Sequence, residues 1–184
     1  MLKKILRFGT ILLILVLVIG FFLPTHYAIK QDININANPS SIHYWTDDLV
    51  RWPNWQAWHI LTPQLEFIYG EKNQGVGAFL AWQNEQVEGE LTISHINGQQ
   101  IDYNMLFNNE HLALSQLSFT VIAPTQTKVT WSIKGEINTP VLAGYLTLYY
   151  KVVLAQALEL GLRNLKEQSE ITQSELVHST NIYP

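Results

Sequence analysis

Histidine is the side chain best suited to acid–base or metal chemistry at neutral pH, and this chain of 184 residues has six of them. Histidine ligands of a metal are typically four residues apart on a helix or alternate along one strand. No pair in this chain has either arrangement, so the sequence predicts no metal site and no cofactor. The six are His26, His43, His59, His95, His111 and His178.

One histidine has the position of a candidate general base. His95 shares the parity of Leu91 and Ile93 along a predicted strand, so its side chain is expected to point inward with theirs. Tyr103, on the next predicted strand, is its candidate hydrogen-bond partner. The alternative is a hydrogen-bonded core histidine without a catalytic role, which is the more common reason for a single inward histidine.

Two carboxylates also share one face of a predicted strand. Glu88 and Glu90 are about 7 Å apart by the rise of a strand, a spacing that paired acid–base groups can use. Their parity is opposite to that of Leu91, so they are expected to lie in solvent. The sequence has no cysteine, no G-x-S-x-G elbow, no phosphate-binding loop and no dinucleotide fingerprint. It therefore predicts no set of catalytic residues.

The distribution of charge excludes another class of function. Of the 11 basic residues, Lys3, Lys4 and Arg7 precede residue 24, which leaves 8 basic residues against all 15 acidic ones and a net charge of −7 for the rest of the chain. A surface this acidic repels phosphate backbones, so no nucleic-acid partner is expected.

An apolar segment occupies the N-terminal part of the chain. Residues 5–23 form a run of nineteen whose only charge is Arg7, and Pro24 follows it. As a helix this run is roughly 28 Å long, close to the thickness of the hydrocarbon core of a bilayer. The sequence therefore predicts a transmembrane anchor over residues 1–24, with the membrane as a partner through residues 5–23.

A cleaved signal peptide is the alternative for this segment. Cleavage needs small residues after the apolar run, and this chain has Phe21, Phe22 and Leu23 there, which favours an uncleaved anchor. Three basic residues, Lys3, Lys4 and Arg7, lie at the N-terminal end of the run and only Lys30 follows it closely, which predicts a cytoplasmic N-terminus. The expected location is the cell (inner) membrane, as a single-pass protein with its domain on the extracytoplasmic side.

Alternating apolar and polar residues dominate the middle of the chain. They predict about seven strands, joined mostly as an antiparallel meander, with Asn97-Gly98 as the clearest hairpin signal. A short helix is predicted over residues 39–48, because Asn38 is a good N-cap and Pro39 suits the first turn. The predicted strands cover residues 28–36, 65–69, 78–83, 87–94, 101–107, 111–123 and 127–135.

Helical periodicity replaces alternation after Pro140 and continues to about residue 168. Leu154, Leu158, Leu162 and Leu165 fall on one face of this helix. Its first ten residues, 141–150, are apolar all round but too few to span a membrane a second time. A long helix buried against a curved sheet explains the pattern. Residues 169–184 are polar and without a period, so they are predicted to be a mobile tail.

These elements and several short motifs resemble one known superfamily. The motifs are Asn38-Pro39, Arg51-Trp52-Pro53-Asn54-Trp55, Gly75-Val76-Gly77-Ala78, Val129-Thr130-Trp131 and Gly161-Leu162-Arg163-Asn164-Leu165-Lys166. Over residues 28–168 the chain resembles the START-like (SRPBCC) superfamily, in its bacterial polyketide cyclase/dehydrase-like branch. The resemblance implies an α+β helix-grip domain over residues 25–168, in which a curved antiparallel sheet of about seven strands wraps round the long C-terminal helix and leaves a cavity between them.

In such a fold, inward strand residues and the apolar helix face would line the cavity and hold a hydrophobic small molecule. The same side chains could instead fill the core, but a high share of Tyr, Trp and Met favours a pocket. Trp52, Trp55 and Trp58 have two interpretations: a plug at the end of the sheet, or an entrance to the cavity that also touches the membrane interface. The expected lining residues are Phe67, Tyr69, Trp82, Tyr103, Met105, Phe107, Trp131, Leu146, Tyr149 and Val153.

Three functions follow as hypotheses. The first is a membrane-tethered binding module for an apolar or lipid-like small molecule. The second is an enzyme of the polyketide cyclase/dehydrase-like type that uses the same cavity, with His95 as its base. The third is a non-catalytic domain that binds a protein through its outer face or its tail. The sequence identifies neither the ligand nor a protein partner.

Overall fold

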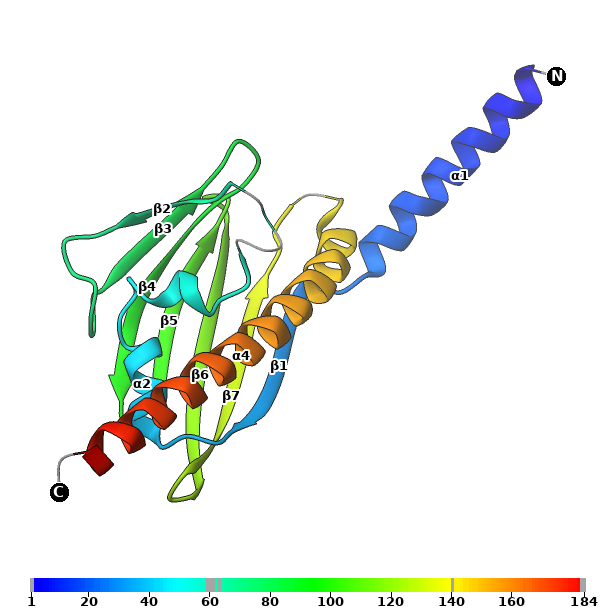
Figure 1. Ribbon diagram of the computed structural model, residues 1–184. Helices are drawn as coiled ribbons and strands as arrows, with labels where there is room; N and C mark the ends of the chain where they lie inside the picture. The colour runs from blue at the N-terminus through cyan, green and yellow to red at the C-terminus, as the bar shows by residue number, and fades with distance from the viewer. Residues whose placement is uncertain (1, 59–61, 63, 140, 183–184) are drawn as a thin grey trace.

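A curved antiparallel sheet wraps round one long helix in this computed structural model (Figure 1). The structure describes residues 2–58, 62, 64–139 and 141–182. Within these residues the sheet has seven strands in the order β1-β7-β6-β5-β4-β3-β2, so β2 to β7 form a meander and β1 joins its far edge beside β7. The strands are β1 (His26–Ile35), β2 (Glu66–Tyr69), β3 (Phe79–Gln83), β4 (Glu88–Asn97), β5 (Gln100–Phe107), β6 (His111–Ala123) and β7 (Gln126–Glu136).

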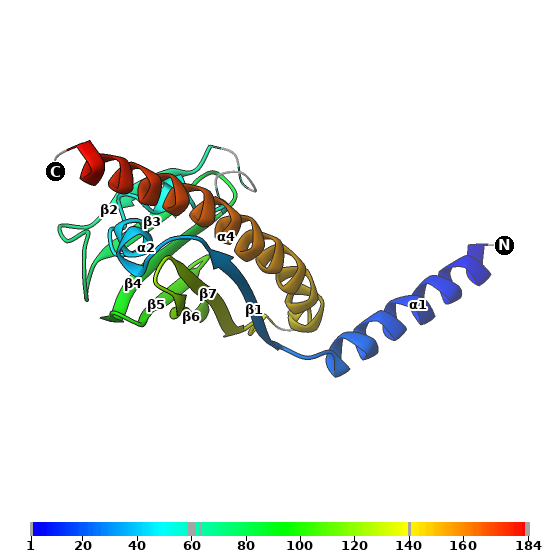
Figure 2. The same ribbon diagram turned by 60° about the horizontal axis from the view of Figure 1, so that its bottom comes forward.

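The helix α4 (Ala143–Ile182) crosses one face of this sheet, and Figure 2 shows the sheet curving beneath it. This arrangement confirms the predicted α+β helix-grip architecture. The Asn97-Gly98 hairpin is confirmed as well, because Asn97 pairs with Gln100 across the turn between β4 and β5.

Alternation along the strands decides which side chains face α4. On β7, Val129, Trp131 and Ile133 are buried, whereas Lys128 and Lys134 lie on the opposite face of the sheet. The helix presents the matching apolar face that the sequence predicts, with Leu154, Leu158, Leu162 and Leu165 all buried. Together these two faces form the hydrophobic core.

Two short elements close the grip. In α2 (Pro39–Thr46), the side chain of Asn38 accepts a hydrogen bond of 3.0 Å from the backbone N–H of Ser41, as expected of an N-cap. The 3-10 turn η1 (Trp52–Asn54) has Pro53 in its first turn, where the missing N–H costs nothing.

The helix α1 (Leu2–Phe22) lies outside the grip and meets the N-terminal end of α4. Its residues 3–22 are long and apolar enough to cross a membrane, and they are almost wholly exposed. The hydroxyl of Tyr145 donates a 2.7 Å hydrogen bond to the carbonyl of Val16, and that of Thr147 donates one of 3.1 Å to the carbonyl of Thr25.

Since β1 follows α1 after only three residues, one end of the sheet lies next to α1. Strand pairing shows which residues of the other strands lie at this same end. The pairs there are His26 with Glu136, Phe107 with both His111 and Gly89, and Gln83 with Glu88. We call it the α1 end of the sheet.

The C-terminal helix is longer than the sequence predicts. It does not end near residue 168 but continues to Ile182, and Ser169 is fully buried. Hydrogen bonds join the extension to α2 and to the residues just before it, and such contacts leave no hydrophobic periodicity in the sequence. Glu170 accepts the N–H of Asn36, and Thr172 accepts the indole N–H of Trp45. The predicted mobile tail is therefore corrected for residues 169–182; residues 183 and 184 lie outside the described residues.

Substitution of Gly161 tests how closely α4 packs on the sheet. A β-carbon at Gly161 would lie 2.7 Å from the Trp131 ring. Alanine normally stabilises a helix interior by about 1 kcal/mol relative to glycine, but we expect Gly161→Ala to lower the free energy of unfolding by about 1–3 kcal/mol through overpacking. Urea denaturation in detergent, followed by circular dichroism, measures this. Gly98→Ala, which has open space around it, is the neutral control; a stabilised Gly161→Ala would contradict the packing.

Substitution of Gln173 tests whether the extension of α4 is docked. The Gln173 side chain accepts hydrogen bonds from the N–H of Asn38 and the hydroxyl of Ser41, both at 3.1 Å. We expect Gln173→Ala to lower the free energy of unfolding by about 1 kcal/mol and to speed amide hydrogen exchange in α2. Gln156→Ala, on an exposed face of the same helix, should change neither quantity. Unchanged exchange in α2 would show that the extension is not held there.

Candidate functional site

Seven aromatic side chains form a connected cluster in the interior of the grip, and we call them the aromatic core. Trp52 lies at its centre. The centroid of the Trp52 ring is 5.6 Å from that of Trp55, 6.3 Å from that of Tyr103, and 6.4 Å from those of Trp82 and Trp131. At these distances aromatic rings are in direct contact. The members are Trp52, Trp55, Trp58, Trp82, Tyr103, Phe107 and Trp131.

Distant parts of the chain supply these rings. Three come from η1 and the residues after it, and the others from β3, β5 and β7. Hydrogen bonds fix two of the indoles in addition to packing: Trp55 donates to the carbonyl of Trp45 at 3.0 Å, and Trp131 donates to the hydroxyl of Ser115 at 2.9 Å. The full burial of Trp52 and Trp55 favours a structural role for them over contact with a membrane.

Side chains fill the space where a cavity was expected. The exposed fraction is 0% for Trp52 and Trp55 and 1% for Tyr103 and Trp131. Values so close to zero leave no void the size of a water molecule against these rings. The interior between the sheet and α4 is therefore packed at its centre, and a ligand there would have to displace protein side chains.

The ten residues expected to line a cavity divide into three groups. Two of them are exposed: Tyr69 ends the edge strand β2, and Tyr149 lies on the side of α4 away from the core, whereas its neighbour Tyr150 packs against the core. The partly buried members are Phe67, Leu146 and Val153, and the buried members are Trp82, Tyr103, Met105, Phe107 and Trp131.

The burial of the aromatic core is lowest at the α1 end of the sheet. The exposed fraction rises to 4% for Trp82, 7% for Phe107 and 8% for Trp58, and these three rings contact one another. Trp58 stacks on Trp82 with an interplanar angle of 8°. At the same end, an open hollow of about 1040 Å³ lies between the β3–β4 turn, the start of β2 and Tyr149.

Buried polar atoms without protein partners lie close in sequence to these rings. The side-chain amide nitrogen of Gln56 and the indole nitrogen of Trp58 are both buried and have no hydrogen-bond partner among the described residues. The same is true of Nδ1 of His111, at the α1 end of the sheet. An unsatisfied buried group costs roughly 1–3 kcal/mol. A ligand that brings a hydrogen-bond acceptor to the amide or indole donor would remove this cost and bind more favourably. Sequence analysis missed Gln56 because it lies in the irregular tryptophan segment.

The position of His95 differs from the expected one. The register between β4 and β5 shifts between Ile93 and His95, and this bulge reverses the parity that should have turned the imidazole inward. His95 is exposed and contacts the side-chain amide of Asn97. Among the histidines that the structure describes, His111 is the buried one, and its parity with Ala113 and Leu117 was the available signal. Glu88 is exposed, as its parity predicts.

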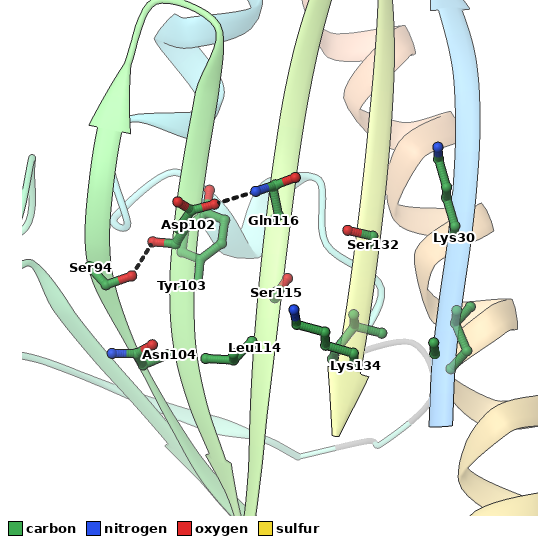
Figure 3. A pocket seen from close by; sticks show the side chains of 13 residues that line it. Lys30, Ser94, Asp102, Tyr103, Asn104, Leu114, Ser115, Gln116, Ser132 and Lys134 are labelled. Atoms are coloured by element: carbon green, nitrogen blue, oxygen red, sulfur yellow. Dashed lines mark hydrogen bonds between the residues drawn. The ribbon is translucent and has the colours of Figure 1, made fainter. Parts of the chain in front are cut away.

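A second hollow, of about 560 Å³, lies on the face of the sheet away from α4 (Figure 3). Asp102 lies within it and accepts hydrogen bonds from the side-chain amides of Gln100 and Gln116. Lys30 and Lys134 border it from β1 and β7. Both polar and apolar residues line this hollow, and the sheet itself separates it from the aromatic core.

Comparison with known proteins places the fold. No protein family and no curated protein matches the sequence significantly. Solved structures similar to this chain have the helix-grip (Bet v 1-like) fold. The KanY protein has a TM-score of 0.60 and 16% identity over 79% of this chain and 98% of its own. Protein TTHA0849 from Thermus thermophilus has a TM-score of 0.59 and 14% identity over 78% of this chain and 97% of its own.

Norcoclaurine synthase from Thalictrum flavum, solved in complex with dopamine and hydroxybenzaldehyde, is a third example. Its TM-score is 0.55, with 10% identity over 77% of this chain and 85% of its own. At these identities the similarity shows the shared fold alone.

Burial predicts how two tyrosines respond to alkaline pH. Burial, with a smaller contribution from Tyr150, raises the pKa of Tyr27 to about 12, and burial raises the pKa of Tyr103 further still. Because the folded pKa exceeds the unfolded one, this contribution to stability is complete below about pH 10 and is lost as the pH rises toward 12.

Tyr27→Phe removes one of these groups and also a buried hydroxyl for which the described residues provide no hydrogen-bond partner. We expect stability to fall less steeply with pH in this variant than in the wild type, and to be no lower near neutral pH. Denaturation at a series of pH values, with tyrosinate absorbance recorded in parallel, measures both. The exposed Tyr44 gives the control, Tyr44→Phe, which should keep the wild-type slope; an unchanged slope in Tyr27→Phe would contradict the prediction.

Proposed function

We propose that this protein is a membrane-tethered binding module that takes an apolar or amphipathic small molecule into the α1 end of the grip. One observation carries the proposal: the least buried rings of the aromatic core meet at that end, and the buried donors of Gln56 and Trp58 belong to the same short segment. An apolar site with a few polar groups is typical of small-molecule pockets.

The ligand would replace protein side chains rather than fill an empty cavity. Trp58 is the ring with the largest exposed fraction in the aromatic core, and its indole nitrogen has no hydrogen-bond partner within the described part of the chain. When a ligand displaces the Trp58 ring, the contacts of the ring are replaced by apolar contacts of the ligand. The net cost is therefore smaller than that of opening the fully buried centre around Trp52. A ligand oxygen could also accept from the Gln56 amide.

The tether places this site near a source of apolar molecules. We interpret residues 3–22 as a membrane span, and the segment from Pro24 to Ala28 cannot exceed about 18 Å when extended. The basic residues at the N-terminal end of the span, Lys3, Lys4 and Arg7, support a cytoplasmic N-terminus and a domain on the extracytoplasmic side of the cell membrane. The domain would then stay beside the bilayer, where lipid-like molecules are concentrated.

Other observations favour this function over the two alternatives. The structure of norcoclaurine synthase with two small aromatic molecules supports binding of small organic ligands by this fold. The exposure of His95 leaves the enzyme hypothesis without its candidate base. The start of the tail already contacts α2 and the residues just before it, through Glu170, Thr172 and Gln173, and this weakens the case for that part of the tail as a free protein-binding segment.

Native mass spectrometry of the full chain, released from detergent, tests the proposal. We expect the wild type to carry one small-molecule adduct after detergent and loosely bound lipid are removed, and an organic extract to identify it. Trp58→Ala should bind the extracted molecule more tightly, by about tenfold, because the ligand no longer has to displace the indole.

The control is Ile68→Ala, which removes a half-exposed side chain on the outer face of β2. It should leave the affinity unchanged. The proposal would be overturned by a folded chain that is repeatedly purified empty and whose Trp58→Ala variant also carries no adduct.

A further inference from the structure

The N-terminal turns of α4 and the two residues before them, Val141 and Leu142, expose much apolar surface. Leu148 is 44% exposed, Leu142 52%, Val141 56%, Val152 59% and Tyr149 63%. We call these five residues the apolar collar. Large side chains concentrated in this way on one surface typically mark a contact with a membrane or another protein.

The charges nearby match a lipid surface. Between Val141 and Leu158 the chain has one charged side chain, Lys151, and the first acidic residue after the collar is Glu159. Lys151 lies about 15 Å along the helix axis from Val141, with an aliphatic stem that can lie along apolar surface while its ammonium reaches lipid phosphates.

The collar is continuous with α1. Gly20 of α1 and Gly144 of α4 allow the two helices to approach closely, because a β-carbon on Gly20 would lie 2.6 Å from the Tyr145 ring and one on Gly144 would lie 3.0 Å from the carbonyl oxygen of Gly20. The hydroxyl of Tyr145 reaches further, to the carbonyl of Val16. The start of α4 is thus packed along the last two turns of α1.

This contact fixes the depth of α4 once α1 spans a bilayer. Val16 precedes Phe22, the last residue of α1, by six residues, or about 9 Å of helix. If residues 3–22 fill the hydrocarbon core, the Tyr145 ring that reaches Val16 must lie below its surface. Val141 and Leu142 directly precede α4, and a β-carbon on Gly20 would lie 3.0 Å from the carbonyl oxygen of Val141, so this segment lies at the depth of the last turn of α1.

We infer that the apolar collar inserts into the leaflet nearest the domain, so that the protein contacts the bilayer through α4 as well as α1. The inference takes from the proposed function only that α1 spans the membrane, and it requires no ligand. The occupant of the collar is lipid, because the collar adjoins the membrane helix and has no acidic side chain within it. This second contact turns the α1 end of the sheet toward the bilayer.

Single cysteines test the inference cleanly, since the natural chain has none. Leu142→Cys and Leu148→Cys are labelled with a fluorophore in the full chain and reconstituted into phosphatidylcholine–phosphatidylglycerol vesicles. Quenching is measured with nitroxide-labelled lipids and with aqueous iodide. Val18→Cys reports the anchor, and Val121→Cys, on an exposed site at the far end of β6, reports a position in solvent.

We expect lipid nitroxide to quench the labels at residues 142 and 148 several-fold more than the label at residue 121, and iodide to show the opposite order. Quenching by lipid at residue 18 but not at residues 142 and 148 would overturn the inference while leaving the anchor intact. Protection of the collar from both quenchers would overturn it in favour of a second copy of the chain. Absence of lipid quenching at residue 18 would overturn both the anchor and the inference.

A second pair of variants gives an independent readout. Leu148→Glu places a charge in the collar, and Val121→Glu places one at the control site. We expect Leu148→Glu to lower lipid quenching of a label at residue 142, since burial of a carboxylate in hydrocarbon is costly, whereas Val121→Glu should not. Equal quenching in the two variants would overturn the inference.

Discussion

Contact between Trp52 and its four aromatic neighbours is the interaction on which the rest of the structure depends. A curved sheet and a single helix cannot bury each other's apolar faces without something to fill the space between them. Here the Trp52 and Trp55 rings fill that space, and η1 delivers both from outside the sheet. Trp131 then presents a surface so close to α4 that only glycine fits opposite it, at residue 161. The packing around Trp52 therefore accounts together for the curvature of the sheet, the position of α4 and the path of the tryptophan segment.

The same packing limits where a ligand could bind. At the centre, displacement of Trp52 would open contacts to four other rings at once, and a buried aromatic side chain contributes several kcal/mol to stability. At the α1 end, Trp58 contacts two rings of the aromatic core, Trp82 and Phe107, and is more exposed than Trp52. Under the proposed function, the centre would stay rigid while a ligand exchanges with side chains at the α1 end, so that stability and binding would depend on different parts of the aromatic core.

Sequence patterns predicted most of the fold but less of the site. Strand parity and the Asn97-Gly98 turn predicted the meander correctly. They are reliable signals because a register shift of one residue would expose the whole apolar face of a strand to solvent. The bulge before His95 escaped this reasoning, since one extra residue reverses parity without changing composition. Ser169 and the helix around it escaped for another reason: hydrogen bonds, which leave no hydrophobic period, hold that segment. Tyr149 and Tyr150 lie on different sides of α4. The sequence around them is apolar on every side of the helix, so its pattern could not show which of the two faces the core.

The two ends of α4 are held by different kinds of interaction, and this difference orients the grip. Polar side chains join its C-terminal part to α2, far from α1, whereas glycine contacts and the Tyr145 hydroxyl join its N-terminal part to α1. A helix of 40 residues that is fixed at both ends and packed on Trp131 in between cannot tilt freely. If α1 spans a bilayer, the rigid helix passes that orientation to the sheet. The α1 end, with Trp58 and the hollow beside Tyr149, then faces the membrane, and a ligand leaving the bilayer would meet the exchangeable end of the aromatic core first.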